Sequence, residues 1–124
     1  MRNISEEELK EALRPIASLI SKSEKAQQKL VPGTWQHKML QDNLKALYIA
    51  TKLMNSETIN TDTIMQEDLR RAIRALDSMI SRSEKAQTKF SPGTSQHTLQ
   101  RNRTNALRMA SEWIGAALSE QEGM

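Results

Sequence analysis

The chain has 124 residues, no cysteine and four aromatic side chains, and its 18 basic and 15 acidic residues give a net charge of +3. This length suits one domain with a sizeable core, and the lack of cysteine excludes disulfides, thiolate metal sites and a cysteine nucleophile. The chain also lacks the basic groove interleaved with stacking rings that single-strand binding uses, so its composition argues against a nucleic acid partner.

The N-terminal segment predicts a helix rather than a targeting signal. Three successive glutamates stand where a secretory signal needs an apolar core, and no stretch approaches the roughly 20 apolar residues of a membrane span. We therefore expect a cytoplasmic protein with no membrane partner.

Ser5 and Glu8 form a capping box, and Leu9, Leu13, Ile16 and Ile20 follow at helical spacing. This pattern predicts a first helix that runs to about residue 30, with a kink at Pro15.

The sequence "VPGT" predicts the end of this helix and the start of the next. Proline disfavours helix in the residue before it, Gly33 supplies turn backbone, and Thr34 can cap a second helix. The polar stretch "NSETINTDT", residues 55–63, then predicts a connection. A third helix from about residue 65, a second "PGT" turn and a fourth helix repeat the pattern.

Residues 4–54 align on residues 64–114 without a gap, and 22 of the 51 positions are identical. Thirteen of these identities fall in the 18 positions of residues 20–37, around "SEKAQ" and "PGT". The alignment indicates a tandem duplication. We expect a single domain, residues 1–124, with an all-α fold: an antiparallel four-helix bundle built from two tandem helix-turn-helix repeats. The alternative is a pair of separate hairpins that swap between chains.

In an up-down-up-down bundle both turns lie at one end, so the repeated stretches are expected to form a composite polar cap. On a helical wheel a serine and two glutamines of each copy face inward there. The candidate cap residues are Ser23, Glu24, Gln27, Gln36, His37, Ser83, Glu84, Gln87, Gln96 and His97. One interpretation is that they lock the turns and fix the pairing register, and the other is that they bind a small ligand or a peptide.

The pattern does not favour an enzyme, a metal or a cofactor. His37 and His97 with Glu24 and Glu84 would make a symmetric metal set, but His37 lies on the side of its helix away from the apolar stripe. The Glu-x-x-His pattern of di-metal bundles is absent. No serine has a histidine and an acid at a recognised spacing.

The copies differ on the back of the second helix. Leu40, Leu44 and Tyr48 form a second apolar stripe there, and their counterparts are Gln100, Thr104 and Arg108. We interpret the stripe as a homodimer face, the alternative being a wider core. Charge at Leu44 is then expected to dissociate the dimer, and charge at Thr104 to change nothing.

The function expected is a non-enzymatic helical interaction or adaptor module that acts as a homo-oligomer. The alternative is a small-ligand sensor or an enzyme that uses the polar cap.

Overall fold

The structure, a computed structural model, describes residues 4–55 and 64–123 and consists of four helices there, with no strand. This confirms the prediction of an all-α fold with four helices. The helices are α1 (Glu6–Gln28), α2 (Trp35–Asn55), α3 (Gln66–Thr88) and α4 (Ser95–Glu122). The predicted connection at residues 55–63 lies, beyond Asn55, outside the described residues.

The ends of the first helix follow the capping signals of the sequence. The Glu8 backbone N–H donates to the Ser5 hydroxyl oxygen at 3.1 Å, as the capping box predicts. The helix ends at Gln28, two residues before the predicted end, because the N–H groups of Lys29 and Leu30 bond back to carbonyls three residues earlier. The helix is continuous through Pro15.

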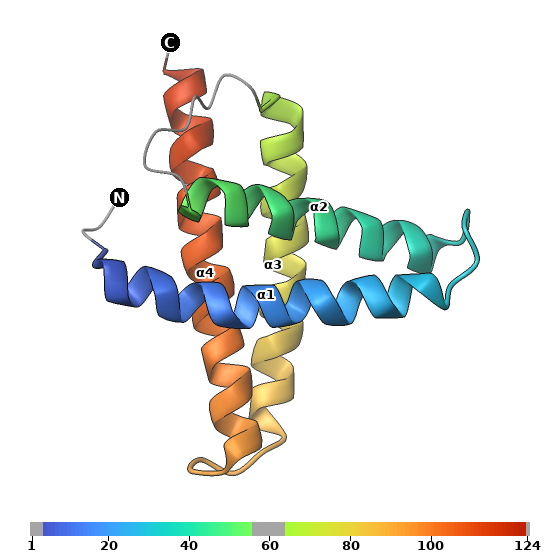
Figure 1. Cartoon of the computed structure of the whole chain (residues 1–124), viewed down its shortest axis with the longest axis vertical. Coiled ribbons are helices and arrows are strands. Elements are labelled where there is room, and N and C mark those ends of the chain that lie inside the picture. The colour runs from blue at the N-terminus through green and yellow to red at the C-terminus, as the bar shows by residue number, and fades with distance from the viewer. Residues whose placement is uncertain (1–3, 56–63, 124) are drawn as a thin grey trace.

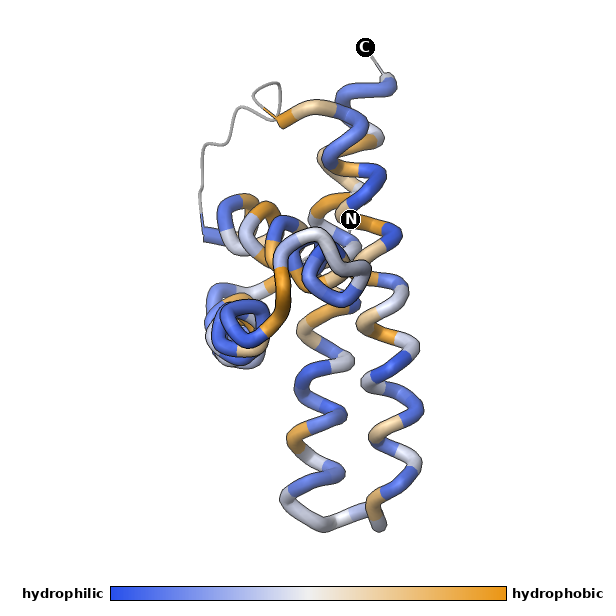
Figure 2. Tube along the Cα trace, turned by 90° about the vertical axis from the view of Figure 1, so that its right-hand side faces the viewer, coloured by the Kyte–Doolittle hydropathy of each residue, from blue (hydrophilic) through white to orange (hydrophobic). Residues whose placement is uncertain are grey.

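Two helix hairpins cross each other in two layers. Helices α1 and α2 run side by side across the front of α3 and α4, as Figure 1 shows. Figure 2, turned by 90°, shows the two hairpins as separate layers. Helix α1 packs on α4, and α2 packs on both α3 and α4. The four helices therefore do not share one axis, as they would in the up-down-up-down bundle.

The apolar core lies where the hairpins cross. It receives buried side chains from all four helices, and Ile16, Leu47, Leu76 and Leu107 are among those almost fully shielded from solvent. Part of this core consists of small residues, whose side chains allow packed helices to approach closely. These are the buried alanines Ala12, Ala46, Ala50, Ala72, Ala106, Ala110 and Ala117.

Each hairpin extends past the crossing as an arm that ends in a PGT turn. We name residues 20–41 the first arm and residues 80–101 the second arm, and neither contains a fully buried residue. The reason is visible in the sequence, because polar Ser23 and Gln27 continue the stripe that Ile16 and Ile20 begin. The fully buried part of the apolar stripe thus ends where the arms begin, and the hairpins cross instead of aligning along their full length.

None of the helices in the described part of the chain has a segment both long and apolar enough to span a bilayer.

Candidate functional site

The two PGT turns have the same local structure. The glycines Gly33 and Gly93 have φ angles of 94° and 93°, a region that side chains with a Cβ rarely adopt. The Thr34 hydroxyl accepts the His37 backbone N–H at 3.3 Å, and the second turn repeats this contact from its threonine to His97 at 3.2 Å. Both threonine hydroxyls also donate to a carbonyl three residues earlier, at 2.8 Å. The turn geometry therefore accounts for the repeated glycine and threonine of "PGT".

Glutamine and glutamate side chains connect the two helices of each hairpin. The Gln27 amide donates to the His37 carbonyl at 3.4 Å, and the Gln87 amide lies 3.4 Å from the His97 ring nitrogen Nε2. Glu24 accepts the Tyr48 hydroxyl at 2.8 Å. In the second arm the matching glutamate, Glu84, accepts a guanidinium N–H from Arg108, also at 2.8 Å. Each repeated glutamate thus bridges to the opposite helix, with a different partner in each copy.

The bond between Glu24 and Tyr48 raises the pKa of the Tyr48 phenol above its ordinary value. The hydrogen bond is the main cause, since it needs the phenol proton, and desolvation and the negative charge of Glu24 act in the same direction. Tyr48 is 46% exposed, so solvent weakens this coupling.

The structure does not bring the two repeated segments together. The turn between α1 and α2 and the turn between α3 and α4 lie at the free ends of different hairpins (Figure 1). The predicted composite cap is therefore two separate ends. Ser23, Gln27, His37 and their counterparts Ser83, Gln87 and His97 are half-buried, whereas Glu24, Gln36, Glu84 and Gln96 are exposed. The inward orientation expected for Gln36 and Gln96 is not found.

The predicted oligomer face is not one continuous exposed stripe. Leu44 is only 5% exposed within the single chain, Leu40 is half-buried, and Tyr48 alone is exposed. The counterpart of Leu44, Thr104, is 2% exposed, and its hydroxyl donates to the Gln100 carbonyl at 2.9 Å. The central position of the stripe therefore faces the chain's own interior in both copies.

Four lysines are identical in the two copies and lie at the C-terminal ends of α1 and α3, where positive charge is favourable for the helix dipole. Lys25 and Lys29 in the first arm match Lys85 and Lys89 in the second, and all four are exposed. Within the described part of the chain, none of their ammonium groups forms an ion pair or a hydrogen bond. Like charges four residues apart on a helix repel each other by about 0.2–0.5 kcal/mol. The helix dipole offsets this repulsion, but it does not require a lysine at all four positions, so the dipole alone does not explain why all four are identical in both copies.

Positive charge is concentrated in the arms. Each arm contains four basic residues and one acidic residue, a net charge of +3, so the remaining ten basic and thirteen acidic residues carry −3. By sequence pattern alone, the arm lysines are typical of an ordinary solvated helix face. Their identity in both copies was the signal that could have singled them out.

A pocket of about 530 Å³ lies beside the second turn. Three of the predicted cap residues, Glu84, Gln87 and His97, line it together with Arg101 and Arg108. The first hairpin has Leu44 and Tyr48 where the second has Thr104 and Arg108, so the first hairpin carries less polar side chains at these two positions.

Across residues 4–55 and 64–123, no group of three or more histidines and acids is placed to hold a metal ion. No family model, no curated protein and no solved structure matches the chain.

Proposed function

We propose that the protein is a non-enzymatic interaction module whose two arms bind the same kind of acidic protein surface. One observation carries this proposal: the residues most alike in the two copies lie in the exposed arms, and they include four lysines with no partner in the chain. A folded core would not need them. Two equivalent binding elements in one chain give avidity toward a partner that repeats its binding surface.

The two hairpins are proposed to be copies of one ancestral hairpin, residues 4–54 and 64–114, fused within a single domain. The matching turn geometry and the matching glutamate bridges support this origin. Each hairpin is an antiparallel pair, and fusion places both arms in one chain at a fixed crossing.

We also propose that the chain acts as a homodimer in the cytoplasm. The support is the half-buried apolar surface of the arms, which a second copy could cover. Its members are Ile20, Leu30, Met39, Leu40 and Ile80. The opposite charges of the arms and the rest of the chain would favour such contacts.

The test of acidic binding uses a labelled peptide of eight glutamates, titrated into the protein and followed by nuclear magnetic resonance. We expect two peptides per chain, with shifts at both arms. The double variant Lys25→Gln/Lys29→Gln should weaken binding at the first arm only, and Lys85→Gln/Lys89→Gln at the second only. Binding should weaken as salt is added, because exposed charges are screened.

The matched control is the double variant Lys10→Gln/Lys52→Gln, which removes the same charge from exposed positions outside the arms. If this control weakens binding as much as the arm variants, the peptide responds to net charge alone and the proposal fails.

A small-ligand sensor or an enzyme is the second candidate, favoured by the pocket beside the second turn. His97 and Arg101 would contact the ligand there. The mass of the native protein purified from its host separates the candidates, because a partner adds a whole chain and a ligand adds at most hundreds of daltons.

A further inference from the structure

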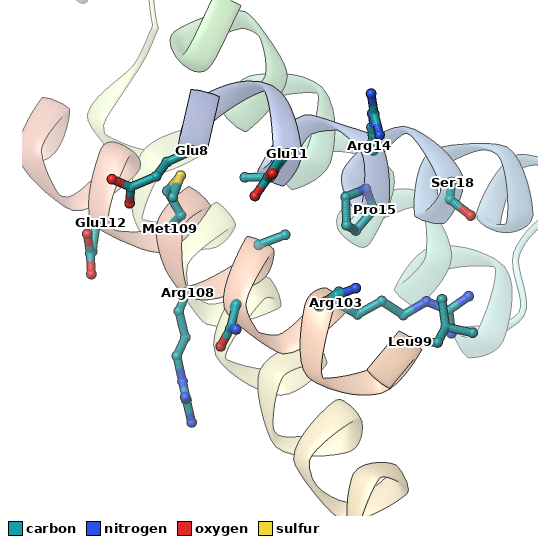
Figure 3. A pocket seen from close by; sticks show the side chains of 14 residues that line it. Glu8, Glu11, Arg14, Pro15, Ser18, Leu99, Arg103, Arg108, Met109 and Glu112 are labelled. Carbon is teal, nitrogen blue, oxygen red and sulfur yellow. The ribbon is translucent and has the colours of Figure 1, made fainter. Parts of the chain in front are cut away.

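A second and larger pocket, of about 790 Å³, lies where α1 crosses α4. Its volume is within the range of small-molecule sites, roughly 300–1,000 Å³. Pro15, Leu99 and Met109 give it an apolar lining, and Leu99 is 46% exposed. Figure 3 shows Glu8 and Glu112 at one end and Arg103 with Leu99 at the other, with Glu11 and Pro15 between them.

Because the chain is duplicated, this pocket can be compared with the matching position in the other copy. The corresponding crossing of α2 on α3 carries a pocket of about 180 Å³, and six of its lining positions are those of the large pocket shifted by 60 residues. An ion pair between Lys45 and Asp68, with a nitrogen–oxygen distance of 3.0 Å, spans this smaller pocket. In the large pocket Asn105 occupies the position that corresponds to Lys45, and Glu8 the position that corresponds to Asp68. The matching ion pair therefore cannot form there.

The large pocket also has charged groups without partners. Arg103 replaces the buried Asn43 of the first copy, and its Nε atom is buried with no hydrogen-bond partner. An unsatisfied buried donor is unfavourable, so the Arg103 guanidinium lacks part of the hydrogen bonding that a carboxylate would offer it. The side chains of Glu11 and Arg14 make no hydrogen bond or ion pair within the described part of the chain.

From this arrangement we propose that the α1/α4 pocket binds a small zwitterion with an apolar body, an apolar amino acid or a short peptide with free ends. Its carboxylate would accept from Arg103, in the charge-assisted bond that guanidinium groups form with carboxylates. Its ammonium group would lie toward Glu11, at the end where Glu8 and Glu112 add negative charge. Pro15, Leu99 and Met109 would contact the apolar body. This proposal does not rest on the acidic partner proposed for the arms.

Isothermal titration calorimetry with leucine and with trileucine tests the site and separates an amino acid from a peptide. We expect saturable binding of at least one of them at one site per chain. N-acetyl-trileucine and trileucine amide, which each lack one charge, should bind at least about tenfold more weakly than trileucine if the peptide is the ligand. If the amino acid is the ligand, N-acetyl-leucine and leucine amide should likewise bind at least about tenfold more weakly than leucine.

Variants assign the binding to this pocket. Arg103→Met keeps the stem of the side chain and Glu11→Gln keeps its shape, and each should weaken binding at least about tenfold. Asn105→Lys offers Glu8 the ion pair of the smaller pocket and should prevent binding. The control is Arg71→Gln, at the position matching Glu11 in the smaller pocket, which should leave the dissociation constant unchanged.

Circular dichroism establishes that each variant is folded. The proposal is overturned if neither leucine nor trileucine binds the wild-type chain saturably up to about 10 mM, a concentration that would detect even weak ligands. Equal affinity for the blocked and free ligands, or wild-type affinity in the folded Arg103→Met and Asn105→Lys variants, would also overturn it.

Discussion

At the scale of single residues, the repeated sequence has two separate physical causes. Gly33, Thr34 and their counterparts are explained by the turn, because the backbone conformation and the cap hydrogen bonds require them. Lys25, Lys29 and their counterparts are not explained by any contact in the chain. The sequence alone could identify the turn residues, whose chemistry is local. It could not separate the lysines from a solvated face, since that distinction depends on which partners the fold supplies.

The turn glycines give the first prediction. No atom lies within 4 Å of a Cβ built on either glycine, so Gly33→Ala and Gly93→Ala should act through backbone strain alone. We expect each to lower the free energy of unfolding by about 1–3 kcal/mol in urea denaturation. The control is Gly115→Ala inside α4, also with open space around it, which should raise stability by about 0.5–1 kcal/mol. Loss of stability in all three variants would contradict the backbone explanation.

Tyr48 gives a prediction for pH dependence, and it is the chain's only tyrosine, so its titration is directly visible by ultraviolet absorbance. Its pKa should lie above the ordinary value of about 10, and Glu24→Gln should return it toward that value. Because the folded pKa is raised, the stabilisation from this bond is complete below the unfolded pKa and is lost as the pH rises through the folded pKa. A Tyr48 pKa unchanged by Glu24→Gln would show that the hydrogen bond does not persist in solution.

At the scale of helices, the periodicity of the sequence predicted the elements well but not their packing. The stripe from Leu9 to Ile20 and the caps at Ser5 and Thr34 are local features, and the helices begin where these predict. The crossing depends on how far each apolar stripe extends. The polar residues Ser23 and Gln27 on that stripe indicated this limit, but a bundle that buries them with hydrogen-bonded partners fits the same pattern.

On the back of α2, too, the sequence pattern did not predict how the helix packs, and the observed packing leads to a stability prediction. Leu44 and Thr104 are both buried in the single chain, so Leu44→Glu and Thr104→Glu should each place a charge where water cannot solvate it. We expect both to lower the free energy of unfolding by more than about 3 kcal/mol. This differs from the expectation from sequence, in which the first change dissociates a dimer and the second is neutral.

Urea denaturation and light scattering distinguish these outcomes, with the exposed Gln36→Glu as a control that should stay within about 0.5 kcal/mol of the wild type. If the Leu44→Glu protein is fully stable but changes from dimer to monomer, the stripe of Leu40, Leu44 and Tyr48 is a dimer interface after all.

At the scale of the whole molecule, the fold separates a stable centre from two exposed arms. All the fully buried residues lie outside residues 20–41 and 80–101, in or near the crossing. Figure 2 shows the second arm, at the bottom, as mostly hydrophilic. Repetition, charge and exposure thus coincide in the arms, and the apolar contacts that hold the chain together coincide at the crossing. A binding surface placed this way can change its side chains without cost to the core.

The last prediction follows from this separation and is measured by native-state hydrogen exchange. Backbone amides in the arm helices, residues 20–27 and 80–87, should exchange at least about tenfold faster than those of residues 46–54 and 106–114, because local opening there exposes little apolar surface. Both arms should behave alike, since each lacks a buried residue. Equal protection of arms and crossing at all concentrations would show that the arms open only with the whole fold. Protection of the arms that appears only in concentrated samples would mean that a second copy covers them, which is the behaviour expected of the proposed homodimer.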